Sequence, residues 1–297
     1  MKKKRSPLIT LLIVFCIIMF FGLLSTFVSD DNMDGVSFQG DKVGVIKVEG
    51  VIMNSEEVLR QLAELENNNS VKAIVLRIDS PGGAVAPSQE IYSELMRIKK
   101  TKKIVTSMGT VAASGGYYIA CATDEIFANA GTITGSIGVI MEFANFKNLM
   151  EKIGLNTVTI KSGKMKDVGN PMRDMTEHER AYMQELIMDV YEQFVEDISA
   201  GRGIPKEKIY PLADGRILTG RKAFQENLVD NIGTINDAIR RAGELGGIRG
   251  KPVVIYPKKK KINIFDFAFE ESKSQINNYI SEKGFSLNYQ MKLPTSK

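Results

Sequence analysis

Ser114 lies in a run of very small residues, VAASGGYY, which leaves almost no side-chain bulk around its hydroxyl group. A substrate backbone could therefore approach this hydroxyl closely. If a helix begins here, the free N–H groups and positive dipole end at its N-terminus would favour negative charge developing on a carbonyl oxygen. Ser114 is thus a candidate nucleophile. An N-cap beside tightly packed small residues would have the same local sequence.

A serine nucleophile needs a base, and the chain contains a single histidine. His178 lies among Glu177, Glu179 and Arg180 in the first turn of a predicted helix, a setting typical of solvent-exposed side chains. Without this histidine, neither a Ser-His-Asp triad nor a Cys-His pair can be assembled. Lysine is then the main remaining choice for the base.

Lys166 is the candidate base, in the segment IKSGKMKDVG directly after a predicted strand. A lysine acts as a base only when its amine is uncharged, and burial against apolar neighbours lowers the pKa of an amine from its usual value of about 10.4. Lys161 and Lys164 compete for this role. On residue type alone, each of the three would be a solvated surface charge.

The segment DSPGG, at Asp79–Gly83, follows a strongly apolar predicted strand and precedes a predicted helix. Paired glycines permit backbone conformations that direct two amide groups at a ligand, which suits an oxyanion hole or the binding of an extended peptide. An ordinary turn between a strand and a helix would also fit this segment.

Composition excludes several other classes of function. One histidine, and one cysteine (Cys121) besides Cys16 in an apolar run, cannot supply the usual ligands of a zinc site, and we expect no metal and no cofactor. The net charge of +4 comes from four basic residues near the N-terminus, so a nucleic-acid partner is not expected. No phosphate-binding or dinucleotide-binding glycine motif occurs.

The N-terminus predicts a membrane anchor. The segment from Leu8 to Val28 carries no charged residue and matches the length of about 20 residues that spans a bilayer as a helix. The basic flank MKKKR predicts a cytoplasmic N-terminus, and therefore a single-pass protein of the cell membrane with an extracytoplasmic catalytic part. The alternative is a cleaved signal peptide, although no clear A-x-A site follows.

The rest of the chain alternates strand-like and helix-like patterns, which predicts an α/β fold. The predicted organisation is a stub and anchor (1–28), a linker (29–41), a protease domain (42–257) and a basic and apolar tail (258–297). The predicted strands are 42–52, 71–78, 103–108, 125–127, 136–141, 157–161 and 253–256, and the predicted helices are 56–67, 88–99, one opening at Ser114, 221–227 and 235–245.

The clearest predicted helix begins after Thr176, with a T-x-x-E capping box formed with Glu179. Apolar residues at helical spacing predict one buried face along this helix. They are Met183, Leu186, Ile187, Val190, Phe194 and Ile198, and Gly201 is the predicted end.

Five blocks in this order, DSPGG, AASGGYYIA, TGSIGV, KSGKMKDVG and ADGRILTGRKA, resemble those of the bacterial signal peptide peptidase family, SppA, in its short single-domain form. The resemblance spans about residues 43–247. It implies a fold similar to that of Clp protease and crotonase, a superhelix of ββα units, here preceded by the transmembrane helix.

The resemblance also implies roles for individual residues. Ser114 corresponds to the nucleophile, Lys166 to the general base, and Ser136 in TGSIGV to the serine that orients the lysine. Gly83 and the amide of Gly115 are the oxyanion-hole candidates. Similar family members form homo-oligomeric rings in which the serine and the lysine come from neighbouring subunits.

The function implied is a serine endopeptidase with a Ser-Lys dyad that degrades signal peptides left in the membrane after secretion. One alternative is a membrane-bound Clp-class protease acting on other membrane proteins or on misfolded extracytoplasmic proteins. A second alternative is a protein on the same fold without peptidase activity, either a binding scaffold or an acyl-CoA enzyme.

Overall fold

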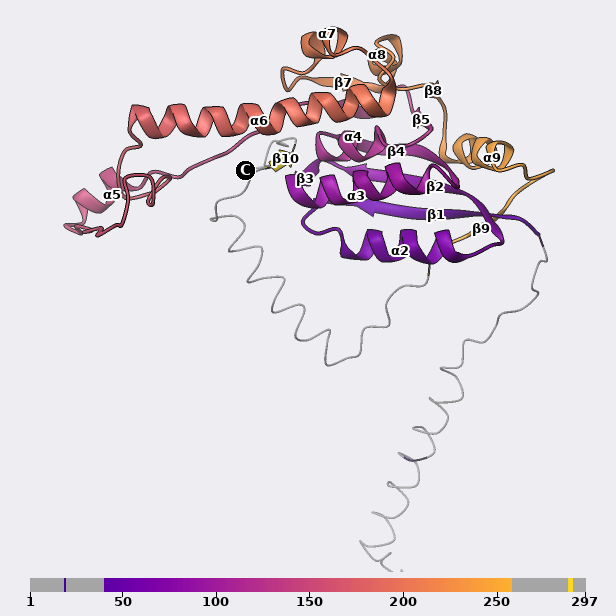
Figure 1. Cartoon of the computed structure of the whole chain (residues 1–297), viewed down its shortest axis with the longest axis horizontal. Helices are drawn as coiled ribbons and strands as arrows, with labels where there is room; N and C mark the ends of the chain where they lie inside the picture. The colour runs from indigo at the N-terminus through magenta and orange to yellow at the C-terminus, as the bar shows by residue number, and fades with distance from the viewer. Residues whose placement is uncertain (1–18, 20–39, 258–287, 291–297) are drawn as a thin grey trace, which may run out of the picture. The chain divides into compact units, whose positions relative to one another are not determined.

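A computed structural model of the chain describes residue 19, residues 40–257 and the backbone of residues 288–290. The chain divides into two compact units, Met1–Gly40 and Asp41–Lys297. The second unit is built on a sheet that is mostly parallel (Figure 1). The predicted α/β class is therefore confirmed.

The central sheet has eight strands within the described residues, with the core order β7-β6-β4-β2-β1-β9. β4 pairs in parallel with β2, β5 and β6, whereas β7 is antiparallel to β6. The strands are β1 (Lys42–Glu49), β2 (Val71–Ser80), β4 (Lys103–Ala113), β5 (Glu125–Ala128), β6 (Ile133–Gly135), β7 (Ile217–Thr219), β8 (Asn231–Ile232) and β9 (Val253–Ile255). The carboxyl ends of the parallel strands consequently meet at one edge.

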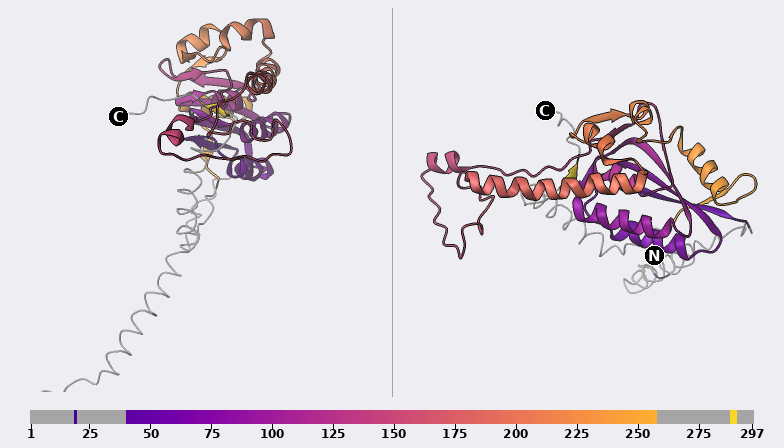
Figure 2. Two further views of the ribbon diagram at one scale, coloured as in Figure 1. Left: turned by 90° about the vertical axis from the view of Figure 1, so that its left-hand side faces the viewer. Right: turned by 45° about the horizontal axis from the view of Figure 1, so that its top comes forward.

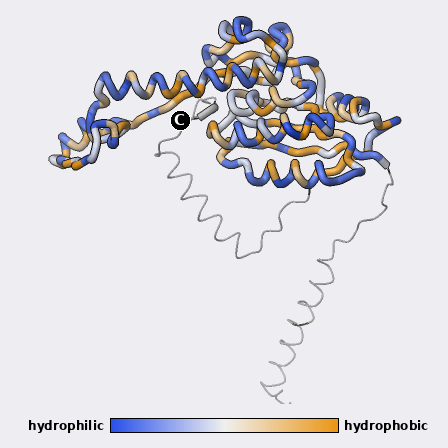
Figure 3. The backbone as a smooth tube through the Cα atoms, in the orientation of Figure 1, coloured by the Kyte–Doolittle hydropathy of each residue, from blue (hydrophilic) through white to orange (hydrophobic). Residues whose placement is uncertain are grey.

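Side chains of β1 and β2 alternate between two hydrophobic cores, because successive residues of a strand face opposite sides of a sheet. Ile46 and Leu76 belong to the larger core, and Val45 and Val75 belong to the smaller core. Both faces are covered, so the strands are almost continuously hydrophobic, as the orange strands in the middle of Figure 3 show.

Helices cover both faces of this sheet (Figures 1 and 2). On the larger core lie α2 (Glu56–Asn67), α3 (Val85–Ile98), α4 (Gly115–Ala120) and α6 (Glu177–Arg202), whereas α9 (Ile235–Leu245) packs on the smaller core. The remaining helices are α5 (Lys147–Lys152), α7 (Lys206–Ile209), α8 (Gly220–Gln225) and the 3₁₀ helix Tyr210–Leu212. The prediction was accurate for α2 and α9, and α3 begins three residues earlier than predicted.

The long helix α6 has the predicted capping box at its N-terminus. The side-chain oxygen of Thr176 accepts from the N–H of Glu179, and the Glu179 carboxylate accepts from the N–H of Thr176. The predicted end at Gly201 was wrong. The helix continues to Arg202, and Gly203 ends it with a left-handed φ of 64°, which a glycine adopts at little cost.

Two predicted strands were wrong. β6 ends at Gly135, and Ser136 has a φ of +51°, which turns the backbone out of the sheet instead of continuing a strand over residues 136–141. Residues 157–161 have no regular secondary structure. Their β-branched residues favour extended backbone, but no neighbouring strand within the described part of the chain pairs with them.

Residues 141–175 form a segment, here called the arm, that extends beside the N-terminal half of α6 and away from the sheet (Figures 1 and 2). The arm contains α5 and several exposed apolar side chains. Val158 is 90% exposed and Ile160 is 96% exposed. The arm therefore contributes little to the cores of its own chain.

Two predictions concern segments outside the described residues. The anchor (8–28) and most of the tail after Pro257 fall there. Within the residues that the structure describes, no helix has both the length and the hydrophobicity needed to cross a membrane. From the tail, only β10 (Asn288–Gln290) is described, paired antiparallel with β3 (Gly82–Ala84).

Phe194 links α6 to the main core, since it is fully buried and its ring meets Tyr118 edge to face at 4.9 Å between centroids. We expect Phe194→Ala to lower the free energy of unfolding by about 3 to 5 kcal/mol, because the cavity left behind cannot collapse completely. Tyr182→Ala on the same helix is the control, since Tyr182 is 49% exposed. Chemical denaturation measures both, and equal effects of the two substitutions would contradict the expectation.

Candidate active site

Ser114 and Ser136 lie next to each other because of the register between β4 and β6. Ala113 pairs with Gly135, so each serine is the residue that directly follows this pair. The N–H of Ser114 donates to the Gly135 carbonyl over 2.8 Å, and the N–H of Ser136 donates to the Arg216 carbonyl over 2.8 Å. The sheet therefore fixes the backbone of both serines.

Both serines have a strained backbone. Ser114 has a φ of +53° and Ser136 has a φ of +51°, values that residues with a side chain rarely adopt. Such outliers persist only where surrounding structure imposes them, and they concentrate at functional sites. Among the described residues, one other non-glycine residue, Asn227, has a positive φ, and asparagine adopts this conformation more readily than most residues.

The two serines line one cavity of about 800 Å³. Its remaining walls come from the segment after β6, from α6 and from the segment leading into β7. They are formed by Gly138, Val139, Ile140, Met141, Glu142, Gln184, Ile187, Met188, Tyr191, Ala213, Asp214, Gly215 and Ile217. A cavity whose walls combine apolar and polar side chains beside a candidate hydroxyl group suits a peptide substrate.

Ser114 occupies the N-cap position of the short helix α4, where the sequence predicts a helix to begin, but its side chain makes no capping hydrogen bond, and Gly115 is the first residue of that helix. The N–H of Gly115 has no partner within α4, because the first N–H groups of a helix have none. Gly116 allows α4 to pack against the end of β2, since a Cβ atom there would lie 2.9 Å from the Ser80 carbonyl oxygen. The small residues thus serve both the packing and the access to Ser114.

The segment DSPGG forms a compact turn at the end of β2. The Asp79 carboxylate accepts from the N–H of Val111 over 3.0 Å, and the Ser80 hydroxyl oxygen accepts from the N–H of Gly82 over 3.1 Å. Gly82 has a φ of +100°, which requires a glycine. The turn is therefore held to β4, the strand that leads to Ser114.

The N–H and carbonyl groups of Gly83 lie on the side of β3 that faces away from Ile52. The carbonyl of Gly82 accepts from the Ile52 N–H, and the N–H of Ala84 donates to the Ile52 carbonyl. Because neighbouring residues of an extended strand direct their hydrogen-bonding groups to opposite sides, the N–H and carbonyl of Gly83 face away from Ile52. A Cβ atom at Gly83 would lie 2.1 Å from the Ile52 carbonyl oxygen, so only glycine fits.

An extended backbone occupies that edge of β3. β10 pairs antiparallel with β3, with Tyr289 opposite Gly83 and Gln290 opposite Gly82. β3 and β10 both contact α4, the helix that follows Ser114. The edge of β3 can therefore hold a peptide backbone close to the candidate nucleophile.

Lys166 does not line the cavity of the two serines in a single chain. It is exposed on the turn 163–168 of the arm, where its N–H donates to the Gly163 carbonyl over 3.1 Å. Of the competing lysines, Lys161 pairs with the Asp167 carboxylate, and Lys164 is exposed. The structure thus brings Ser114 and Ser136 together and places Lys166 on a separate element.

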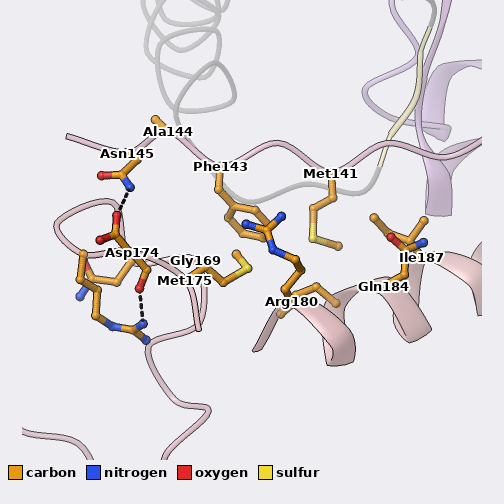
Figure 4. Close-up of a pocket in the computed structure, with 13 residues that line it drawn as sticks. Met141, Phe143, Ala144, Asn145, Gly169, Asp174, Met175, Arg180, Gln184 and Ile187 are labelled. Carbon is orange, nitrogen blue, oxygen red and sulfur yellow. Dashed lines mark hydrogen bonds between the residues drawn. The ribbon is translucent and has the colours of Figure 1, made fainter. Parts of the chain in front are cut away.

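A second cavity, of about 590 Å³, lies between the arm and α6 (Figure 4). Met141 and Phe143 of the arm face Arg180 and Gln184 of the helix. Gly169 closes the turn beneath Phe143 with a φ of +78°, and a Cβ atom there would lie 2.4 Å from the phenyl ring. Because Gly169 has no side chain, the turn that follows Lys166 can pack against the ring of Phe143 within the arm.

The structure also shows where the single histidine lies and how the potential metal ligands are distributed. His178 is exposed in the first turn of α6 and does not line the cavity of Ser114. No group of three or more potential metal ligands occurs among the described residues.

Several cavity residues were not found from the sequence. Met188, Tyr191 and Ile217 line the Ser114 cavity, and Ile187, assigned to the buried face of α6, lines both cavities. Of the predicted buried face, only Val190, Phe194 and Ile198 are buried. Helical spacing identifies an apolar face, but it does not distinguish a core from a cavity wall.

Comparison with known proteins gives the family. The model of peptidase family S49 matches residues 96–249, and the model of the Clp protease family matches residues 45–133. These overlapping matches cover most of the sheet, both serines and the arm. The resemblance inferred from the five sequence blocks is thereby confirmed.

Individual relatives agree with the family matches. A Synechocystis protein named as a protease is 44% identical over 209 residues, which cover 70% of this chain and 75% of that protein. An Enterococcus faecium protein named as a signal peptide peptidase SppA is 41% identical over 187 residues, covering 63% of this chain and 54% of that protein. A Methanocaldococcus jannaschii protein named as a protease is 31% identical over 284 residues, covering 90% and 91%. The chain belongs to peptidase family S49 and is a serine peptidase.

Proposed function

We propose that this peptidase is a membrane-anchored endopeptidase with a dyad of Ser114 and Lys166, which degrades signal peptides left after secretion. The observation that carries the proposal is the position of Ser114, between a cavity and a strand edge that pairs with an extended backbone. A substrate peptide that takes the place of β10 on β3 would run past the hydroxyl while its side chains enter the cavity. The Clp family match supports a superhelix of ββα units for the fold.

The reaction would follow the usual course of acyl transfer. The Ser114 oxygen attacks the carbonyl carbon of the substrate, and the Lys166 amine accepts the hydroxyl proton. The amide groups of Gly83 and Gly115 donate to the oxyanion, and Ser136 orients the lysine. The amine of the substrate leaves with the proton from Lys166, and a water molecule then hydrolyses the ester.

The base would come from a neighbouring copy of the chain in a homo-oligomeric ring. Lys166 lies outside the Ser114 cavity of its own chain, on an arm with apolar side chains that are more than half exposed. They are Leu149, Ile153, Leu155, Val158 and Ile160. Burial of these residues against a second copy would stabilise an assembly, and would bring Lys166 to a second Ser114.

Two further features support the proposed substrate and the proposed location of the enzyme. The cavity walls include the apolar side chains of Val139, Ile187 and Met188, and signal peptides are rich in apolar residues. The segment from Leu8 to Val28 would hold the enzyme in the cell membrane with its catalytic unit outside the cytoplasm. A Clp-class protease acting on other membrane proteins or on misfolded extracytoplasmic proteins is the second candidate, supported by the Clp family match.

We expect Ser114→Ala and Lys166→Ala each to lower kcat for peptide hydrolysis by about four orders of magnitude, because each removes one half of the dyad. Lys164→Ala, in the same turn, is the matched control and should retain activity. A fluorogenic peptide assay measures all three variants, with size-exclusion chromatography to verify assembly. Activity close to wild type in assembled Lys166→Ala protein would refute the dyad.

Mixing tests whether the site is shared between copies. Coexpressed in equal amounts, the inactive Ser114→Ala and Lys166→Ala chains should give about a quarter of wild-type activity, because each shared site needs an intact serine from one chain and an intact lysine from its neighbour. A site formed within one chain would stay inactive in the mixture. Mass spectrometry of the assembly verifies that the two chains mix.

Substrate length and hydrophobicity separate the two candidate functions. We expect the enzyme, reconstituted in detergent micelles, to cleave synthetic signal peptides with a kcat/KM at least about tenfold above that for unfolded soluble proteins of average hydrophobicity, a difference of about 1.4 kcal/mol. Cleavage products are quantified by mass spectrometry. A preference for the unfolded proteins would favour the Clp-class alternative.

A further inference from the structure

Arg173 lies between two carboxylates at the base of the arm. Its Nε and Nη2 atoms donate to the two carboxylate oxygens of Asp167, each over 2.9 Å, and its Nη1 atom donates to Glu179 over 2.8 Å. The Nη2 atom also reaches the backbone carbonyl of Asp167 over 3.1 Å. One guanidinium group therefore binds both the backbone and the side chain of the residue that follows Lys166.

The second carboxylate connects this cluster to α6. The Glu179 carboxylate that accepts from Arg173 also accepts from the N–H of Thr176 over 2.9 Å in the capping box. The Glu179 side chain is 4% exposed and that of Asp167 is 11% exposed. The turn that carries Lys166 is thereby tied to the first turn of the longest helix.

The hydrogen bonds from Arg173 lower the pKa of both carboxyl groups, that of Glu179 to about 2, so both stay charged at neutral pH. Lys161 adds a second cation at Asp167. The side chain of Asp167 thus lies in the cluster, whereas Lys166 on the same turn is exposed. Among the described residues no ion pair joins the Lys166 ammonium group to this cluster.

We infer that Arg173 is a positioning residue: by binding Asp167 and Glu179 together, it fixes the turn from which Lys166 reaches Ser114 of a neighbouring copy. The inference rests on the proposed function, in which Lys166 is the base. The lysine side chain is long and flexible, so the position of its backbone determines whether the amine can reach Ser114 and be oriented by Ser136. A displacement of about 1 Å at a reacting group is enough to cost about a hundredfold in rate.

Arg173→Met and Arg173→Lys test the inference in the full-length protein. We expect both to lower kcat for a fluorogenic peptide by about tenfold to a hundredfold with KM unchanged, because peptide binding depends on β3 and the cavity and not on the arm turn. Arg173→Lys keeps the charge but loses the planar guanidinium group, whose several N–H donors bind two carboxylates at once. A role in charge balance alone predicts that lysine restores kcat.

Lys147→Met is the matched control. Lys147 forms an ion pair with Asp174 on the same arm, over 2.7 Å, and does not contact the turn of Lys166. We expect its kcat to stay within about twofold of wild type, as for most exposed ion pairs. Glu179→Gln is a further variant, since it keeps the shape of the capping residue and weakens the bond to Arg173.

The experiments distinguish failure of the Arg173 inference from failure of the proposed function. A kcat of Arg173→Met within twofold of wild type, or a change confined to KM, would overturn the inference. If Arg173→Met does not assemble, the comparison of Glu179→Gln with Lys147→Met decides, and equal kcat values would again overturn it. An active Lys166→Ala variant would instead refute the proposed function, whatever Arg173 does.

Discussion

The pairing of Ala113 with Gly135 is the constraint on which the candidate site depends. These residues end β4 and β6, and the next residue of each strand is a serine with a left-handed backbone. A slip of the register by one residue would turn the side chains to the other face of the sheet and separate the two hydroxyl groups. The two hydrophobic cores that cover the sheet stabilise this register, so the packing far from Ser114 determines its position.

The sheet and its nearest helices could be predicted because their patterns are local. Alternating side chains in β1 and β2, the apolar face of α2 and the capping box at Thr176 each report a structure formed by neighbouring residues. Ser114 could also be selected as a candidate from the sequence, since small residues around a hydroxyl group are a visible signal. The family resemblance added Ser136, whose own sequence context carries no comparable signal.

The arm could not be predicted from the same patterns. Val158 and Ile160 were assigned to a strand because β-branched residues usually fill a sheet, yet both are almost fully exposed in a single chain. A hydrophobic pattern shows that a residue prefers burial, but it does not show whether the covering surface belongs to the same chain. The predicted strand over residues 136–141 failed for a different reason, because the strain at Ser136 is imposed by tertiary contacts.

The exposed position of Lys166, on an element apart from the Ser114 cavity, has a consequence for the cell. Under the proposed function, a single newly made chain would carry both halves of the dyad and remain latent, because its own Ser114 and Lys166 would not meet. Hydrolysis would then begin only at a local concentration high enough for copies to meet, and the proposed membrane anchor would raise that concentration. In this proposed scheme, assembly itself would switch on hydrolysis.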